Sequence, residues 1–437
     1  MGMMNNCHFR VKVHVVTHQG ALALQFEHPT VAANGPGGWM VPKKATDPQA
    51  QAPPPPKPAQ SNGQSGGEPG AAVKTFTKAE VAQNDHEKSA WIIHEGRVYD
   101  CTPYLKDHPG GAESILLAAG QDATEEFDAI HSTKAKAMLA DYYIGDLAPE
   151  GQEEKGEGAR AGAAAPAGAP AVDARPRALD PKRRIAFRLV EKEALSHDTR
   201  RLRFALQSSD HVLGLPVGMH MLVASRVEGK LIMRAYTPIS SDDDVGYFEL
   251  VVKVYFPLAP KFPKGGIMSQ RLDALAIGDE VEVKGPLGHV SYQGRGAFTI
   301  HKEPVRLDAV GLIAGGTGIT PCYQIIKAVL KDAEDRTRVH LLYANKTEDD
   351  ILLRAELDGL AAAHPDRFAL HYTLDSPPAG WTQFEGFITQ AMLETAMPAP
   401  NADTTKIMMC GPPPMIKYAC VPNLDKLGYA EGSYLAF

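Results

Sequence analysis

Two stretches rich in proline, glycine and alanine divide this chain and limit what it can fold into. They cover residues 43–73 and 148–180. Such segments bury too little apolar surface to offset the entropy lost on ordering, so both are predicted to be flexible linkers. The 437 residues also exceed the length at which one hydrophobic core stops growing. The chain is therefore predicted to be multidomain, with a short piece at 1–42, a small domain at 74–147 and a large part at 181–437.

The composition excludes several classes of protein. A net charge of -7 disfavours non-specific binding to nucleic acid, which needs a basic surface. No apolar run approaches the ~18 residues needed to cross a bilayer, so no membrane anchor is expected. The five cysteines form no CxxC pair, which argues against a disulfide framework or a thiolate zinc site. With no secretory signal or transit peptide at the N-terminus, these features favour a cytoplasmic protein.

The first 42 residues contain two β-like runs, at Phe9–Val15 and Leu22–Phe26. An isolated hairpin is marginally stable in water, so this short β fragment is expected to be the edge of a domain that is otherwise missing. Within the large part, residues 181–295 carry short β runs separated by turn residues, a pattern typical of an antiparallel barrel or sandwich. Residues 296–437 alternate apolar strands with helical stretches, which predicts an α/β domain with a parallel sheet.

The small domain contains two histidines, His108 and His131, separated by a helical stretch. Two opposed imidazoles can hold a haem iron from both sides. Pro109 and the following glycines predict a rigid turn that presents His108 and allows the backbone to approach a flat ligand. A single histidine is more often a surface or core residue, and the chain has 16 of them.

The surroundings of these histidines resemble the cytochrome b5 family over residues 74–147. The matching segments are His108–Gly111, Trp91–Ile93, Val98–Asp100, Asp122–Ser132 and Tyr143–Gly145. The resemblance implies a small α+β domain that binds haem b, with His108 and His131 as the two axial ligands of the iron. No iron position would then remain open, which implies an electron carrier. His86 and His94 lie outside the motif and are expected at the surface.

The segment Arg234–Ser240 reads RAYTPIS and follows a predicted strand. It offers a guanidinium for a pyrophosphate, an aromatic face for a ring and hydroxyl donors, although a strand-end turn with a surface arginine is the simpler interpretation. Two further segments follow it, Val251–Tyr255 (VVKVY) and Gly265–Ser269 (GGIMS). The second opens a predicted helix, whose free amide groups suit an anion.

In this order the three segments resemble the FAD-binding domain of the ferredoxin-reductase superfamily, and most closely that of cytochrome b5 reductase. The resemblance implies bound FAD, with Arg234 and Ser269 at the pyrophosphate and Tyr236 and Thr237 near the isoalloxazine. Lys253 is also predicted to be catalytic. The full set of expected flavin-binding residues is Arg234, Tyr236, Thr237, Val251, Lys253, Tyr255, Phe262, Gly266, Met268 and Ser269. His220 and His289 match no motif.

Two glycine-containing turns in the last domain follow predicted strands. Leu312–Pro321 (LIAGGTGITP) joins a strand to a helix, and Met408–Met415 (MMCGPPPM) ends another strand. Such turns can cradle a pyrophosphate but also close ordinary βα units. Cys410 is expected at the carboxyl edge of the sheet, where α/β folds bind ligands, although a small buried thiol is the alternative.

Together with RAYT, these turns resemble the nicotinamide-binding domain of the same superfamily. The resemblance implies that Cys410 packs against the nicotinamide and assists hydride transfer without acting as a covalent nucleophile. The terminal Phe437 is expected near the flavin. The expected contacts of this domain are Gly315, Gly316, Thr317, Gly318, Thr320, Cys410, Gly411, Pro412 and Phe437.

Three acids after a predicted strand, Glu348, Asp349 and Asp350, bear on the choice between NADH and NADPH. They would repel a 2′-phosphate, which only Lys346 would attract, so NADH is favoured and NADPH stays possible. Alternatively, the acids occupy a solvated helix N-terminus.

The inventory of domains predicts a route for electrons from NAD(P)H through FAD to haem. A hydride carries two electrons and a haem iron accepts one, so a flavin is needed between them. The flexible linker at 148–180 would let the haem domain dock at the flavin and then turn to an acceptor. This predicts an oxidoreductase with NADH:ferricyanide and cytochrome c reductase activity.

The acceptor is suggested by the first 42 residues. The segments at 2–13, Phe26–Thr30 and Gly37–Met40 resemble the end of the molybdenum and dimerisation region of plant and algal nitrate reductases. This implies a longer, homodimeric parent whose molybdopterin-bound molybdenum reduces nitrate to nitrite, with that centre absent here. One alternative is a fused cytochrome b5 and cytochrome b5 reductase that serves another haem or lipid-modifying acceptor. The other is a non-catalytic FAD-binding module.

Overall fold

The computed structural model describes residues 74–108, 111–149, 175–241, 243–260 and 262–437, together with two short strands near the N-terminus. These strands, β1 (Thr17–His18) and β2 (Ala21–Leu22), pair antiparallel. The predicted strand at Phe9–Val15, the linker at 43–73 and most of the linker at 148–180 lie outside the described residues. Within the described residues, no helix is both long and apolar enough to span a membrane.

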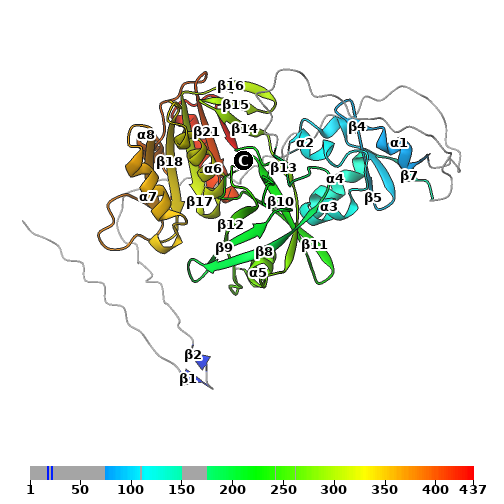
Figure 1. The fold of residues 1–437 in the computed structure, drawn as a ribbon, viewed down its shortest axis with the longest axis horizontal. Coiled ribbons are helices and arrows are strands. Elements are labelled where there is room, and N and C mark those ends of the chain that lie inside the picture. The colour runs from blue at the N-terminus through cyan, green and yellow to red at the C-terminus, as the bar shows by residue number, and fades with distance from the viewer. Residues whose placement is uncertain are drawn as a thin grey trace, which may run out of the picture. The chain divides into compact units, whose positions relative to one another are not determined.

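The segment from residue 74 to 149 forms a five-stranded sheet with short helices, as the predicted α+β domain requires (Figure 1). The strand order is β3-β7-β6-β5-β4. Thr77 and Glu80 form a reciprocal capping box at the first helix, which fixes where it begins. The bounds are β3 (Thr75–Phe76), α1 (Lys78–Ala82), β4 (Asp85–His86), β5 (Ser89–His94), β6 (Arg97–Asp100), η1 (Thr102–Tyr104), α2 (Ala112–Leu116), α3 (Thr124–Ile130), α4 (Thr133–Leu139), η2 (Ala140–Tyr142) and β7 (Tyr143–Leu147).

The next segment folds into a six-stranded antiparallel sheet in the order β11-β10-β13-β8-β9-β12, which confirms the predicted antiparallel β architecture. Its buried face carries Phe187, Phe204 and Phe248, with the last two stacked at 5.1 Å between ring centroids. The bounds are β8 (Ile185–Ala194), β9 (Thr199–Ala205), β10 (His220–Val227), β11 (Lys230–Tyr236), β12 (Tyr247–Lys253), α5 (Ile267–Asp273) and β13 (Glu280–Leu287).

A three-stranded antiparallel sheet, β14 (Val290–Gly294), β15 (Ala297–Ile300) and β16 (Glu303–Arg306), follows directly. It runs across the domain boundary that the sequence placed between residues 295 and 296, because β14 pairs with β15.

The last segment is the predicted α/β domain, with a six-stranded parallel sheet in the order β20-β19-β18-β17-β21-β22 (Figure 1). Every residue of the central strand β17 is buried, as expected for a strand covered on both faces. The bounds are β17 (Ala309–Gly315), η3 (Gly316–Gly318), α6 (Ile319–Lys331), β18 (Arg338–Asn345), η4 (Glu348–Asp350), α7 (Arg354–Ala363), β19 (Phe368–Leu374), β20 (Phe384–Glu385), α8 (Gln390–Ala396), β21 (Thr405–Cys410), α9 (Pro413–Met415), η5 (Ile416–Cys420), α10 (Val421–Lys426) and β22 (Tyr434–Ala436).

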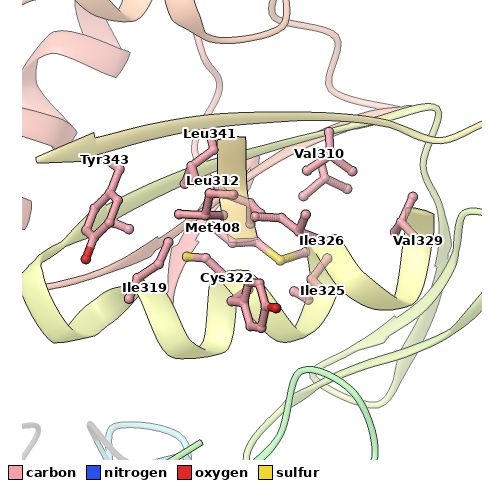
Figure 2. Packing of buried hydrophobic residues seen from close by; sticks show 14 of the residues in the cluster. Val310, Leu312, Ile319, Cys322, Ile325, Ile326, Val329, Leu341, Tyr343 and Met408 are labelled. Carbon is pink, nitrogen blue, oxygen red and sulfur yellow. The ribbon is translucent and has the colours of Figure 1, made fainter. Parts of the chain in front are cut away.

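One hydrophobic core joins the antiparallel strands to the parallel sheet. Figure 2 shows Leu312 and Leu341 of the parallel strands packed on α6 residues such as Ile326. The same cluster includes Val251 of β12 and Val290 of β14. The amide of Gly218 also donates a hydrogen bond of 2.8 Å to Gln324 Oε1 of α6. These shared contacts fix the two sets of strands relative to each other.

Candidate functional site

The imidazole rings of His108 and His131 lie together in the first domain. Their centroids are 5.9 Å apart and their planes are inclined by 46°. A metal bound to one nitrogen of each ring at about 2 Å would hold the centroids about 6 Å apart. The separation therefore fits one iron held between the two rings.

The hydrogen bonds of these imidazoles leave one nitrogen of each ring for a metal. His108 Nδ1 lies 2.9 Å from the carbonyl oxygen of Gly111, and His131 Nδ1 lies 3.0 Å from that of Phe127. A carbonyl only accepts, so each Nδ1 carries the proton and each Nε2 keeps its lone pair. Burial lowers the pKa of His131, which favours the neutral, ligating form. This donor set fits a haem with two histidine ligands.

Apolar and aromatic side chains surround the histidine pair. Phe127 stacks on His131 with centroids 4.0 Å apart, and Tyr104 meets His108 edge to face. Leu139, Ala123 and further residues form the apolar cluster beside them. Such walls suit a flat macrocycle. Gly111 has a φ of +80°, which explains the need for glycine after His108.

The prediction that His86 and His94 both lie at the surface is half wrong. His86 is exposed, but only 8% of His94 is accessible. Nε2 of His94 lies 3.1 Å from Asp128 Oδ1, and the His94 ring packs edge to face on Phe127. His94 therefore supports the aromatic residue that stacks on His131, a role that its distance from the motif in sequence concealed.

The predicted flavin-binding residues gather around the ends of β11 and β12. Arg234 and Tyr236 are on β11, and Thr237 follows it directly. The Arg234 guanidinium donates to the carbonyl oxygen of Met233 at 2.6 Å and stays largely exposed. Burial raises the pKa of Tyr236, whose ring packs on the core of the antiparallel sheet. The strand thus presents one cation beside an aromatic ring.

A turn at Gly266 brings the other flavin segment to β12. Ser269 Oγ donates to the carbonyl oxygen of Gly266 at 3.0 Å and accepts from the amide of Tyr255 at 3.1 Å. A Cβ on Gly266 would lie 2.6 Å from Ser269 Oγ, so glycine is needed there. The residues predicted from VVKVY and GGIMS are therefore neighbours in space.

The remaining predicted flavin residues differ in their accessibility. Val251 and Met268 are 4% and 3% exposed, with both side chains in the core, so only their backbones are open to a ligand. Phe262 is 46% exposed.

Lys253, predicted to be catalytic, forms two ion pairs. Its Nζ lies 2.8 Å from Asp198 Oδ2 and 2.7 Å from Asp350 Oδ1. Burial alone would lower the pKa of Lys253, but the hydrogen bonds to the two carboxylates outweigh it and raise the pKa. Lys253 is therefore a fixed cation that joins the flavin and nicotinamide domains.

The two glycine turns of the last domain lie against each other at the carboxyl edge of the parallel sheet. Ala314 of β17 is in register with Cys410 of β21. A Cβ on Gly318 would lie only 2.1 Å from the carbonyl oxygen of Cys410, so the close approach requires glycine. Gly316 has a φ of +54°. The turns thus form one surface where a pyrophosphate can approach backbone amides.

The thiol of Cys410 stays protonated at neutral pH. Burial raises the pKa of Cys410 to about 11, which fits a packing role better than a nucleophilic one. Tyr255 Oη lies 3.4 Å from Thr317 Oγ1, so a flavin segment touches the nicotinamide turn. The predicted hydride donor and acceptor sites are therefore adjacent.

The other predicted residues of this domain also lie near the same edge. Thr320 is buried and donates to the carbonyl oxygen of Thr317 at 3.4 Å. Gly411 and Pro412 follow β21 directly. The amide of Phe437 donates to the carbonyl oxygen of Met409 at 3.0 Å, which holds the terminal aromatic beside β21.

Sequence reasoning missed the contacts between the haem domain and β10, β11 and β13. Arg226 Nη2 lies 2.9 Å from Glu125 Oε1, and Lys284 Nζ lies 2.5 Å from Glu126 Oε2. Arg184 lies 3.5 Å from Glu125. These acids lie in the first turn of α3, the helix that His131 follows directly. The sequence does show the acidic pair Glu125 and Glu126 beside the haem motif. It does not show their basic partners, which are far away in the chain.

The same helix also contacts β11, the strand that carries Arg234. Arg234 Nη1 lies 3.5 Å from the carbonyl oxygen of Ala129, and Ala129 packs on an apolar cluster of Ala224, Leu231 and Met233. The helix before His131, the predicted haem ligand, is therefore in contact with the strand that carries Arg234, the predicted pyrophosphate contact.

Three family models match the chain in this order. The cytochrome b5-like haem/steroid binding domain matches residues 77–148, the oxidoreductase FAD-binding domain matches 186–292, and the oxidoreductase NAD-binding domain matches 312–421. These matches confirm the predicted fold classes and the cofactors haem, FAD and a nicotinamide nucleotide.

Relatives at about half identity align along the whole chain. The nitrate reductase [NADH] of Petunia hybrida is 50% identical over 100% of this chain and 49% of its own length. The nitrate reductase [NADH] 1 of Zea mays is 49% identical over 100% of this chain and 72% of its own length. The crystal structure of the cytochrome b5 reductase domain of Ulva prolifera nitrate reductase, 48% identical, covers 60% of this chain and all of that domain with a TM-score of 0.58. The chain spans about half the length of most curated relatives that it matches.

Proposed function

The chain belongs to the family of NADH-dependent nitrate reductases, and we propose that it delivers electrons from NADH to the nitrate-reducing centre of a longer protein. Within the chain, electrons pass from NADH to FAD and then to haem. This family membership argues against the alternative of a fused cytochrome b5 and cytochrome b5 reductase with an unrelated acceptor.

The residues of each domain have a distinct role in the proposed electron transfer. Bound FAD would supply the conversion between a two-electron hydride and single electrons, and bound haem would supply one-electron transfer. His108 and His131 would hold the haem iron. Arg234 and Ser269 would hold the flavin pyrophosphate, while Lys253 joins β12 to the nicotinamide domain through Asp350. Cys410, as a neutral thiol, would pack against the nicotinamide.

The observation that carries this proposal is the geometry of His108 and His131. Both Nδ1 atoms are engaged by carbonyl oxygens, and the ring separation of 5.9 Å fits a single iron. If both histidines held a haem iron, they would leave no coordination position open, and such a haem would supply one-electron transfer without binding oxygen or nitrate. The contact between α3 and β11 supports a direct exchange between flavin and haem.

The final acceptor and the setting are part of the proposal. A molybdenum domain of the parent protein would take electrons from the haem and reduce nitrate to nitrite. The parent would be a homodimer, since the first 42 residues resemble the dimerisation region. The cytoplasm would be its compartment, in keeping with the scattered cysteines.

The test uses the purified chain loaded with FAD and haem. We expect NADH to reduce the bound haem, followed by its absorbance in a stopped-flow experiment. We also expect NADH to support the reduction of ferricyanide and cytochrome c. Nitrate should be reduced only after a molybdenum domain from a family member is added. Nitrate reduction by this chain alone would contradict the proposal, as would a haem that NADH does not reduce.

A further inference from the structure

The imidazole of His131 is held in two ways by Phe127, a residue of the helix before it. His131 Nδ1 donates to the carbonyl oxygen of Phe127 at 3.0 Å, and the two rings stack with centroids 4.0 Å apart and planes inclined by 20°. His108, in contrast, donates to the carbonyl oxygen of Gly111 in the turn that follows it. The orientation of His131 therefore depends on where α3 places Phe127, whereas that of His108 depends on its own turn.

His94, the last residue of β5, contacts two consecutive residues of α3. Its ring packs edge to face on Phe127 with centroids 5.0 Å apart and planes inclined by 69°. Its Nε2 lies 3.1 Å from Asp128 Oδ1. A carboxylate only accepts, so Nε2 carries a proton and donates it to this bond. Only 10% of the His94 side chain is exposed, so water competes little for the contact.

The beginning of α3 is attached to the sheet without the help of His94. The amide of Glu95 donates to Thr124 Oγ1, in the first turn of the helix, at 2.8 Å. The bond from His94 to Asp128 lies one turn further along, where a rotation of the helix would move the Phe127 ring sideways. The contacts of His94 therefore fix the rotation of the turn that carries Phe127.

We propose that His94 is a positioning residue for the haem ligand His131 and that it acts through Phe127. An outer group that accepts from the free N–H of a metal-bound imidazole fixes the tautomer and the ring orientation and makes the ligand more basic. Here that group is the Phe127 carbonyl, and His94 keeps it in place. The inference rests on the proposed haem site and deepens it.

An imidazole combines two properties that this position uses. Its ring packs on a phenyl ring as another aromatic residue would, and its N–H reaches a carboxylate as an amide would. His94→Phe keeps the ring without the donor, and His94→Gln keeps a donor without the ring. The two variants therefore separate the contact with Phe127 from the hydrogen bond to Asp128.

The test uses the chain loaded with FAD and haem and measures three properties of the haem. These are the rate of haem transfer to apomyoglobin, the reduction potential, and the electron paramagnetic resonance spectrum of the ferric form. In His94→Leu, which loses both contacts, haem transfer should become about tenfold faster. The potential should rise, because a less basic His131 stabilises ferric iron less, and the spectrum should change with the orientation of the ring. His94→Phe and His94→Gln should give intermediate values.

The matched control is Lys136→Ala, which removes the other partner of Asp128. In that ion pair the two side chains are 37% and 38% exposed, so all three haem properties should stay as in the wild type.

A lower Tm in His94→Leu with an unchanged potential and spectrum would overturn the inference, because a purely structural residue gives that result. An equal effect of Lys136→Ala would also overturn it. Both outcomes would leave the proposed function standing. A wild-type chain that does not bind haem through two histidines would contradict the proposed function itself.

Discussion

Lys253 Nζ lies 2.7 Å from Asp350 Oδ1, which joins the last strand of the flavin sheet to the turn after the second strand of the nicotinamide sheet. This ion pair changes how the acidic residues 348–350 bear on the choice between NADH and NADPH. The sequence suggested three free charges that would repel a 2′-phosphate. In the structure Glu348 is paired with Arg354 and Asp350 with Lys253, which leaves Asp349 as the exposed acid. The preference for NADH therefore rests on less charge than the sequence implied.

Replacing Lys253 should destabilise the joint between the two domains. Lys253→Ala would leave Asp198 and Asp350 close together without their shared cation. Because the three side chains are only 13–21% exposed, we expect a loss of about 3 kcal/mol in the free energy of unfolding, measured by denaturant titration. Lys331→Ala, which breaks an exposed pair with Asp243, is the control and should cost under about 1 kcal/mol. Equal losses in both variants would refute a special role of Lys253.

Replacing either haem ligand should abolish haem binding without affecting the flavin end. His108→Ala and His131→Ala should lack the haem absorption band, because one imidazole cannot fill both axial positions. Each should keep NADH:ferricyanide activity and lose cytochrome c reduction. His86→Ala, at an exposed site of the same domain, should retain full haem content. A haem-loaded His131→Ala protein would show that the ligands are misassigned.

The Cys410 thiol should react slowly with alkylating agents. With a pKa of about 11, only about 0.1% of it is thiolate at pH 8, against roughly a quarter of an ordinary thiol with a pKa near 8.5. We expect labelling by iodoacetamide, followed at this residue by mass spectrometry, to be on the order of 100-fold slower than that of glutathione. Cys410→Ala should slow flavin reduction about tenfold rather than abolish it. Fast labelling at pH 7 would show that the thiol is activated.

Local patterns predicted the fold and named most of the residues that the structure brings together in the candidate site, because each domain is specified by short segments with their own turn chemistry. Gly318 illustrates this, since its place in GGTGITP already implied a close backbone approach, here to Cys410. Residues that act through distant partners were not predictable. The partners of Glu126, for example, lie more than 50 residues away in the chain.

Charge reversal at the contact between haem and flavin domains should slow electron transfer to haem. Glu126→Lys would face Lys284, whose side chain is only 6% exposed, so repulsion there is poorly screened. We expect the stopped-flow rate of haem reduction by NADH to fall at least about tenfold at low salt, with flavin reduction unchanged. The double variant Glu126→Lys, Lys284→Glu should recover part of that rate. Asp332→Lys, in an exposed pair within the reductase, is the control. No recovery in the double variant would argue against a direct pairing.

The stacked pair of His289 and His301 should make the reductase sensitive to mild acid. The rings lie 4.2 Å apart and nearly parallel at 6°. Burial, with smaller contributions from His301 and His220, lowers the pKa of His289 to about 4. In the unfolded chain the histidine pKa is near 6.5. Between about pH 6.5 and 4, His289 is therefore protonated in the unfolded state but not in the folded state. This contribution to stability is complete above pH 6.5 and is lost as the pH falls through that window.

His289→Asn should therefore flatten the fall in unfolding free energy between pH 6.5 and 4, as measured by denaturant titrations at several pH values. His86→Asn, at an exposed site of the haem domain, is the control and should leave the slope unchanged. In NMR spectra of the wild-type chain, the His289 ring should titrate with a midpoint near 4. A midpoint near 6.5 would mean that solvent reaches the ring and that the stacked pair does not oppose its protonation.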